Sequence, residues 1–390
     1  MSSDTKVTVY YGPLSWFEEQ LGQKTRSYLL DVVNERDELK RRIRHTVDGQ
    51  ERNEPEPQAP RPARLVAVSS DYASIQEHAI TNFVGLVRDI SPKHLLLHNP
   101  PALIHAQLDR VLSTTVKRYQ YPVVTRDTLI KFRDGFADHL VGQKSVRERM
   151  LAALYPLTTG RRSKPVVLMF YGPSGVGKTE TAQFVNGLLG GKLLRKQFSM
   201  FHSEKFASYV FGGTHAEASF ARDLLDRSSG VILIDEFDKA NNIFHSAFYE
   251  VFDEGIFEDK NYRVHLGPAL IICTSNYGSE EEIRRALGDA LYSRFDALIP
   301  FESLSREQVL AVIGRLVDHK ISRLMSEEVA LLDVDEIKSQ LTERAGSGGN
   351  VRKLGKLVDE VIALKLVRAV LSSQTSAAAA SSHEHTNMGE

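Results

Sequence analysis

The 390-residue chain contains a single cysteine, Cys273, and a single tryptophan. One cysteine cannot form an intrachain disulfide, and its place inside an apolar run indicates a small buried side chain rather than a catalytic thiol. No apolar run approaches membrane-spanning length, and the first residues lack a basic region followed by an apolar one. We therefore expect a cytoplasmic protein without a membrane partner.

The chain also has almost no net charge, with 49 basic and 50 acidic side chains. This balance gives no global attraction to nucleic acid or to an anionic membrane. No helix-turn-helix or zinc-binding pattern is found either, so a motor that acts on DNA is the least favoured of the functions considered. The length is sufficient for two or three domains.

One stretch carries a strong motif. The apolar run 166–171 is followed by a glycine-rich turn and then by helical spacing over 179–189, which predicts strand, loop and helix. An unbroken apolar run is typical of a strand that is covered on both faces. The strand is therefore expected in the middle of a parallel sheet.

The turn matches the pattern G-x-x-x-x-G-K-S/T through Gly172, Gly177, Lys178 and Thr179. Backbone N–H groups in such a loop form an anion site at a helix N-terminus. Lys178 would place its charge on the β- and γ-phosphates of a nucleotide, and Thr179 would offer a hydroxyl to Mg²⁺. The residues expected to bind the nucleotide here are Gly172, Pro173, Ser174, Gly175, Val176, Gly177, Lys178, Thr179 and Glu180.

Acidic and amide side chains end two further apolar runs. The run 231–236 ends in Asp235 and Glu236, and the run 270–274 is followed closely by Asn276. Ligands bind at the carboxyl ends of strands in open α/β sheets, so we expect Asp235 to hold Mg²⁺ and Glu236 to orient and deprotonate the attacking water. Asn276 would position that water, unless it only forms an asparagine turn.

Two arginines complete the set of candidate catalytic residues. Arg294 precedes the apolar run 297–301 and is either a surface ion-pair partner or a finger that reaches a neighbouring subunit's γ-phosphate. Arg352 lies in the first turn of the last predicted helix, where positive charge opposes the helix dipole. A functional reason for Arg352 is therefore more attractive than a structural one.

Taken in order, these motifs resemble the AAA+ ATPases of the Clp unfoldase and disaggregase type, and most of all their second ATPase module. The resemblance covers about residues 132–371. Its further motifs are Val141-Gly142-Gln143, DEFDKA at 235–240, TSNYGS at 274–279 and SRFD at 293–296.

The resemblance implies a P-loop NTPase fold of the α/β class, with a parallel sheet flanked by helices, a small helical lid and a separate α+β N-terminal region. Copies of such a module assemble as a ring, usually of six, with ATP and Mg²⁺ between neighbours. The implied roles are Walker A for Lys178 and Thr179, Walker B for Asp235 and Glu236, sensor 1 for Asn276, a finger given in trans for Arg294, sensor 2 for Arg352, and the adenine pocket for Val141 and Gly142.

The sequence departs from this family in three places. Residues 208–230 lack the Gly-Tyr-Val-Gly loop that grips polypeptide in the pore, and Tyr209-Val210-Phe211-Gly212 is the candidate substitute. The segment 278–292 leaves no room for the insertion that docks a peptidase, so no peptidase partner is expected. GGNVRKL around Arg352 replaces the usual GARPLKR.

The composition divides the chain further. Residues 48–64 are rich in proline and charge, which is typical of a linker, and the low-complexity end is typical of a disordered tail. The predicted units are an N-terminal helical segment at 1–47, the linker at 48–64, a small α/β accessory domain at 65–125, the large ATPase domain at 126–300, the helical lid at 301–371 and the tail at 372–390.

The function expected from these observations is ATP hydrolysis in a homo-oligomeric ring, a hexamer, that remodels or unfolds protein clients as a chaperone does. The alternative is a nucleotide-gated scaffold or switch, which recruits a partner through the N-terminal region without threading it. The weak match to a pore loop favours this alternative.

Overall fold

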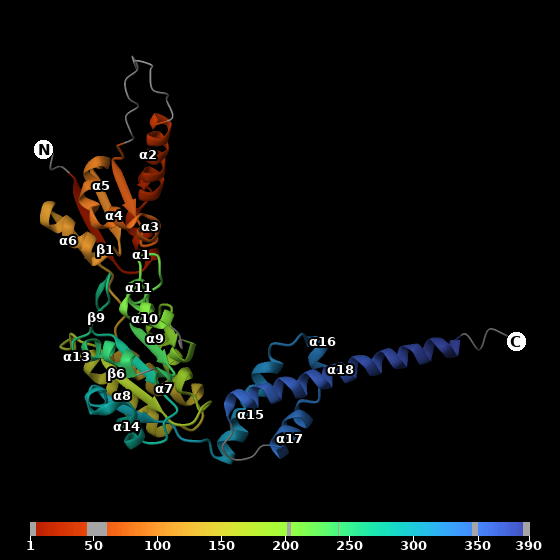
Figure 1. Ribbon diagram of the computed structural model, residues 1–390. Helices are drawn as coiled ribbons and strands as arrows, with labels where there is room; N and C mark the ends of the chain where they lie inside the picture. The colour runs from red at the N-terminus through yellow and green to blue at the C-terminus, as the bar shows by residue number, and fades with distance from the viewer. Residues whose placement is uncertain (1–4, 45–60, 201–203, 241, 345–349, 385–390) are drawn as a thin grey trace.

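The structure is a computed structural model that describes residues 5–44, 61–200, 204–240, 242–344 and 350–384. They form two five-stranded sheets and a set of C-terminal helices, and each of these three parts has hydrophobic core residues of its own (Figure 1). Residues 48–60 of the predicted linker and residues 385–390 of the predicted tail lie outside the described residues.

The first sheet, with its helices, is called the N-terminal module. Its strands are β1 (Lys6–Tyr11), β2 (Ser27–Tyr28), β3 (Arg64–Ala67), β4 (His94–His98) and β5 (Thr114–Arg118), in the order β2-β3-β4-β1-β5. Its helices are α1 (Leu14–Leu21), α2 (Leu29–Arg44), α3 (Asp71–Ser74), α4 (Glu77–Thr81), α5 (Phe83–Ile90) and α6 (Ala102–Val111). Val7 and Val9 of β1 pack with Leu95 and Leu97 of β4 in its main core.

This module corrects three sequence predictions. Residues 1–47 are not a separate helical segment, because β1 and β2 belong to the same sheet as the strands of 65–125. The segment is not one continuous helix either, because α1 ends at Gly22, whose φ is 59°. All four strand pairings are parallel, so the region is of the α/β type and not α+β.

The second sheet, with its helices, is called the core module. Its strands are β6 (Val166–Tyr171), β7 (Leu194–Gln197), β8 (Val231–Asp235), β11 (Leu270–Thr274) and β12 (Ala297–Pro300), in the order β12-β6-β11-β8-β7. Every pairing is parallel, and all residues of β6, β8 and β11 are buried, as the unbroken apolar runs predict. The prediction of a parallel sheet flanked by helices is confirmed.

Helices and one hairpin surround this sheet. The α-helices are α7 (Arg126–His139), α8 (Lys144–Leu154), α9 (Lys178–Leu189), α10 (Glu204–Phe211), α11 (Phe220–Asp226), α12 (Asn242–His245), α13 (Tyr249–Asp253) and α14 (Glu280–Tyr292). Short 3-10 helices are η1 (Tyr155–Thr159), η2 (Phe198–Met200), η3 (Phe237–Lys239) and η4 (Ser246–Phe248). The hairpin joins β9 (Ile256–Glu258) to β10 (Arg263–His265) in antiparallel register.

The C-terminal helices are α15 (Arg306–Ile321), α16 (Ser326–Val329), α17 (Val334–Arg344) and α18 (Val351–Glu384). The capping box that Ser305 and Gln308 predict for α15 is present. Helix α18 corrects the predicted disordered tail, because it continues to Glu384 and projects away from the other helices (Figure 1). Alanine, abundant in this segment, has the highest helix propensity. Across the described residues, none of the helices has the length and apolarity needed to cross a membrane.

The N-terminal module is docked on the core module at the end of α11. The backbone N–H of Leu14 donates to Asp226 Oδ1 at 2.8 Å, and the Tyr121 hydroxyl donates to the Leu225 carbonyl at 3.2 Å. The guanidinium of Arg227, which is 4% exposed, lies 3.7 Å from the centre of the Tyr121 ring. A buried cation over an aromatic face is a strong form of this contact, so it helps to fix the junction.

One face of the core sheet is covered by an aromatic cluster, and Phe248 is its centre. Phe248 is fully buried and its ring lies 5.5–5.9 Å from the rings of Phe198, Phe220 and Phe237. We predict that Phe248→Ala lowers the free energy of unfolding of the core module by about 3–5 kcal/mol, because it leaves a cavity that the sheet cannot close. Urea unfolding followed by far-UV circular dichroism measures the change.

The matched control is Phe211→Ala. Phe211 is 39% exposed, so the same truncation should cost about 1 kcal/mol or less. Equal losses in the two variants would contradict the central place of Phe248.

Candidate nucleotide site

A cavity of about 670 Å³ opens at the carboxyl edge of the core sheet, between the core module and the C-terminal helices. Strand β11 pairs in parallel with both β6 and β8, so the segments that follow these three strands meet at one edge. The lining residues that the sequence predicted are Val141, Ser174, Gly175, Val176, Gly177, Lys178, Thr179, Glu180, Asp235, Glu236, Asn276 and Arg352.

The glycine-rich loop after β6 leaves the N-terminus of α9 open. Gly175 and Gly177 have φ values of 75° and 107°, which favour glycine. Gly177 is the N-cap of α9 and has no side chain that could accept from the first N–H groups of this helix. These donors and the helix dipole favour an anion at this point, as the loop motif predicts.

Lys178, at the start of α9, is buried at the base of this loop. Its Nζ donates to the carbonyls of Gly172 at 2.6 Å and Pro173 at 2.8 Å, and to Asn276 Oδ1 at 3.2 Å. Burial lowers the pKa of this ammonium to about 8, and Arg352 adds to the lowering. The lysine is thus a desolvated cation that lies beside the loop and is bonded to acceptors from two strand ends.

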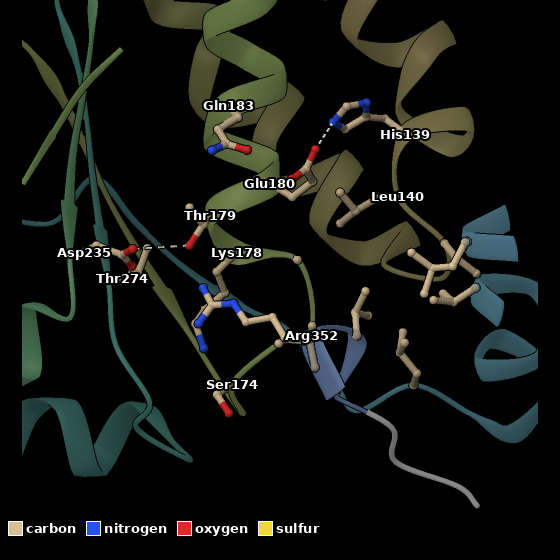
Figure 2. A pocket seen from close by; sticks show the side chains of 18 of the residues that line it. His139, Leu140, Ser174, Lys178, Thr179, Glu180, Gln183, Asp235, Thr274 and Arg352 are labelled. Atoms are coloured by element: carbon tan, nitrogen blue, oxygen red, sulfur yellow. Dashed lines mark hydrogen bonds and ion pairs between the residues drawn. The ribbon is translucent and has the colours of Figure 1, made fainter. Parts of the chain in front are cut away.

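Asp235 and Thr179 lie next to each other in the wall of the cavity (Figure 2). The Thr179 hydroxyl lies 3.4 Å from Asp235 Oδ2, while Oδ1 accepts a hydrogen bond from the Thr274 hydroxyl. A carboxylate and a hydroxyl are the hard oxygen donors that Mg²⁺ prefers alongside substrate phosphates. The residues present therefore fit a magnesium–nucleotide complex.

Glu236 follows directly and adopts an unusual backbone conformation. Its φ is 57°, which is rare for a residue with a side chain and is found where surrounding structure enforces it. Its N–H donates to the Thr274 hydroxyl at 3.0 Å, and its Oε2 accepts from Gln197 Nε2 at 3.1 Å. These contacts hold a carboxylate at the cavity wall, where it can take a proton from water.

The C-terminal helices close the cavity from the other side. The N–H of Val351 donates to the Gly175 carbonyl at 2.9 Å, and Asn350 Nδ2 donates to the Ser174 hydroxyl at 3.1 Å. Arg352, in the first turn of α18, extends toward Lys178 (Figure 2). The start of α18 is therefore tied to the phosphate loop itself.

Four predicted site residues do not line this cavity: Gly142, Gly172, Pro173 and Arg294. Gly142 lines a neighbouring cavity, while Gly172 and Pro173 contribute carbonyls to Lys178. Arg294 donates from Nε to Asp253 at 2.7 Å and lies 4.8 Å from the Tyr249 ring centre, so within its own chain it contacts α13 instead.

Sequence reasoning missed several residues of the cavity. Arg195 reaches it from β7, and Arg315 from α15 donates to the carbonyl of Asp138 at 2.9 Å. His139 Nε2 lies 2.7 Å from Glu180 Oε1, with which it forms an ion pair when protonated, and the ring stacks on Phe184. A basic residue in a short polar strand and a histidine at a helix end carry no pattern of their own, so only the fold could reveal them.

The substitute for a pore loop is not borne out by the structure. Tyr209 and Val210 lie in helix α10 and are 7% and 0% exposed. The Tyr209 hydroxyl donates to Asp223 at 2.6 Å, and the ring belongs to the aromatic side of the core. Tyr209 and Val210 are therefore packed against the core, and of these four residues Phe211 is the exposed one, at the end of α10.

Comparison with known proteins gives a family match. Residues 163–343 match the AAA domain (Cdc48 subfamily). The chaperone protein ClpB of Chlamydia caviae is 26% identical over 283 residues, which cover 63% of this chain and 33% of that protein. The ClpE subunit of Bacillus subtilis is 26% identical over 240 residues, covering 53% of this chain and 34% of that protein. The chain thus spans about a third of the length of these relatives.

Two solved structures of Hsp104 share the fold. A closed-state reconstruction with ATPγS and FITC casein gives a TM-score of 0.55 at 19% identity, covering 79% of this chain and 61% of that one. The ADP complex of Saccharomyces cerevisiae Hsp104 gives 0.52 at 22% identity, covering 63% of this chain and 49% of that one. Together, the loop, the acidic strand end and the match of residues 163–343 support a Clp-type AAA+ ATPase module in this chain.

Proposed function

We propose that this protein binds ATP with Mg²⁺ and hydrolyses it in an assembly of several copies, and that it uses the energy to remodel proteins. One observation carries the proposal: Lys178, Thr179, Asp235, Glu236 and Asn276 converge on a single cavity. The Clp relatives and the Hsp104 structures support it, since the latter contain ATPγS or ADP.

Each residue would contribute a separate part of phosphoryl transfer. The loop N–H groups and Lys178 would hold the phosphates, and Thr179 with Asp235 would hold Mg²⁺, which supplies positive charge to the triphosphate. Glu236 would take the proton of the attacking water, while the Asn276 amide would orient that water. Val141, beside the loop, would contact the base.

The two arginines would act from different places. Arg352 approaches the phosphates from α18 of the same chain, where its side chain is exposed to the cavity. Arg294 lies away from its own chain's cavity, and this position supports a role in the site of a neighbouring copy. A ring, and six copies in particular, is the assembly that we propose from the Clp relatives.

One observation favours a second function, a nucleotide-gated scaffold. Tyr209 and Val210 are buried and thus not available to grip a threaded chain, and a scaffold would recruit its partner through the N-terminal module instead. A permanently unfolded polypeptide should stimulate the ATPase of a remodeller but leave that of a scaffold unchanged. Steady-state ATPase rates with and without this probe separate the two functions.

We predict that Glu236→Gln binds nucleotide with wild-type affinity but hydrolyses ATP at least about 100-fold more slowly, because it removes the proton acceptor and keeps the shape. Phosphate release measures hydrolysis, and fluorescence of mant-ADP measures binding. The matched control is Glu148→Gln, an exposed glutamate on α8 that does not line the cavity. Undiminished turnover in Glu236→Gln would remove Glu236 from this role.

The proposed role of Arg294 in the site of a neighbouring copy is tested by mixing two variants. Arg294→Ala and Lys178→Ala should each lose at least about 100-fold of ATPase activity, and mixing the two should restore part of it. Recovery is expected because a Lys178→Ala copy can lend Arg294 to the intact loop of the other. Arg285→Ala, at an exposed position of α14, serves as the control for Arg294→Ala. Full activity of a dilute monomer would contradict the shared site.

A further inference from the structure

The Asp235 carboxylate already forms an ion pair with an arginine. Arg195, on the edge strand β7, donates from Nε at 3.1 Å and also from Nη2 to the same oxygen, Asp235 Oδ2. The parallel register of β7 with β8 brings this about, because it places Arg195 opposite Leu233, two residues before the aspartate. Among the described residues, Arg195 is the one partner with which Asp235 forms an ion pair.

Asp235 Oδ2, which accepts from Arg195, is also the carboxylate oxygen nearest to Thr179. Thr179 Oγ1 lies 3.4 Å from Oδ2, whereas Oδ1 is held by Thr274. A divalent ion held jointly by Thr179 and Asp235 would use Oδ2, the oxygen that already accepts from two N–H groups of Arg195. Mg²⁺ demands short contacts in near-octahedral geometry, so it would compete with the guanidinium fork for this oxygen.

The side chains of Asp235 and Arg195 differ in exposure, and this difference allows the arginine to be exchanged for another cation. The Asp235 side chain is 8% exposed, so its charge is costly without a counter-ion. The Arg195 side chain is 38% exposed and lines the same cavity, so it has room to turn away into solvent or toward phosphates. Lys178 is attracted to Asp235 electrostatically, but its ammonium donates to loop carbonyls and to Asn276, and these contacts hold it in place.

We propose that Arg195 is a displaceable counter-ion of Asp235, which competes with Mg²⁺ for Oδ2 and thereby sets how strongly nucleotide binding depends on Mg²⁺. The inference rests on the proposed nucleotide site and adds to it a residue that the loop and strand motifs do not include. Arg195 keeps Asp235 neutralised while the metal is absent. It leaves the carboxylate when Mg²⁺ enters with the nucleotide.

Two opposite effects follow for Arg195→Gln. Without Mg²⁺, the phosphates of ADP face an uncompensated carboxylate, so ADP binds more weakly than to the wild type. With Mg²⁺, the ion meets no competitor, so a lower Mg²⁺ concentration suffices. A variant that merely loosened the site would weaken binding under both conditions, and this difference separates competition from a structural role.

The experiment uses the full chain and mant-ADP. Its dissociation constant is measured by fluorescence in EDTA and in saturating Mg²⁺, and the Mg²⁺ midpoint is obtained by titration at fixed mant-ADP. For Arg195→Gln we expect the ratio of the EDTA constant to the Mg²⁺ constant to rise about five- to tenfold, and the Mg²⁺ midpoint to fall. Arg195→Lys, which keeps the charge, should lie near the wild type.

Lys192→Gln is the matched control, because it removes the same charge from an exposed position before β7 and should change neither quantity. Far-UV circular dichroism and the melting temperature establish that each variant is folded. An unchanged ratio in folded Arg195→Gln, with mant-ADP binding intact in the wild type, would overturn this inference alone. A wild-type chain that binds no mant-ADP in Mg²⁺ would overturn the proposed function and this inference with it.

Discussion

The parallel pairing of β11 between β6 and β8 is the constraint on which the site depends. The three strands bury every residue, so a slip in register would expose apolar side chains and is strongly disfavoured. With the register fixed, the loop after β6, the carboxylates after β8 and the amide after β11 have one arrangement. Thr274 then holds both the Asp235 carboxylate and the Glu236 backbone, which couples the two acids to the middle strand.

The sequence predicted those parts of the site whose residues lie close together along the chain. The phosphate loop and the acidic end of β8 each combine an apolar run with polar residues at fixed spacing, and the structure brings both to the cavity. Arg195 was missed because β7 reads Leu-Arg-Lys-Gln, which has no apolar run, and because its partner lies 40 positions further along the chain. Contacts of this kind depend on strand order, which a local pattern does not contain.

The errors at the two ends of the chain have different causes. Strand β1, although six residues long, was not predicted, because its place between β4 and β5 is decided by the whole sheet. The end of α18 was assigned to a tail on its low complexity, although alanine and its neighbours are compatible with a helix that continues from a packed segment. The Tyr209 segment was judged by resemblance alone, and its burial follows from the aromatic cluster that surrounds it.

The docking of the N-terminal module has a mechanical consequence for β8, the strand that ends in Asp235. Several of its contacts fall on Leu225, Asp226 and Arg227, and β8 begins at Val231. A mechanical force applied to the N-terminal sheet is therefore transmitted to the start of β8 through a very short stretch of backbone. Arg227 also donates to the carbonyl of Leu266, just ahead of β11. The same force therefore reaches both β8 and the adjacent strand β11.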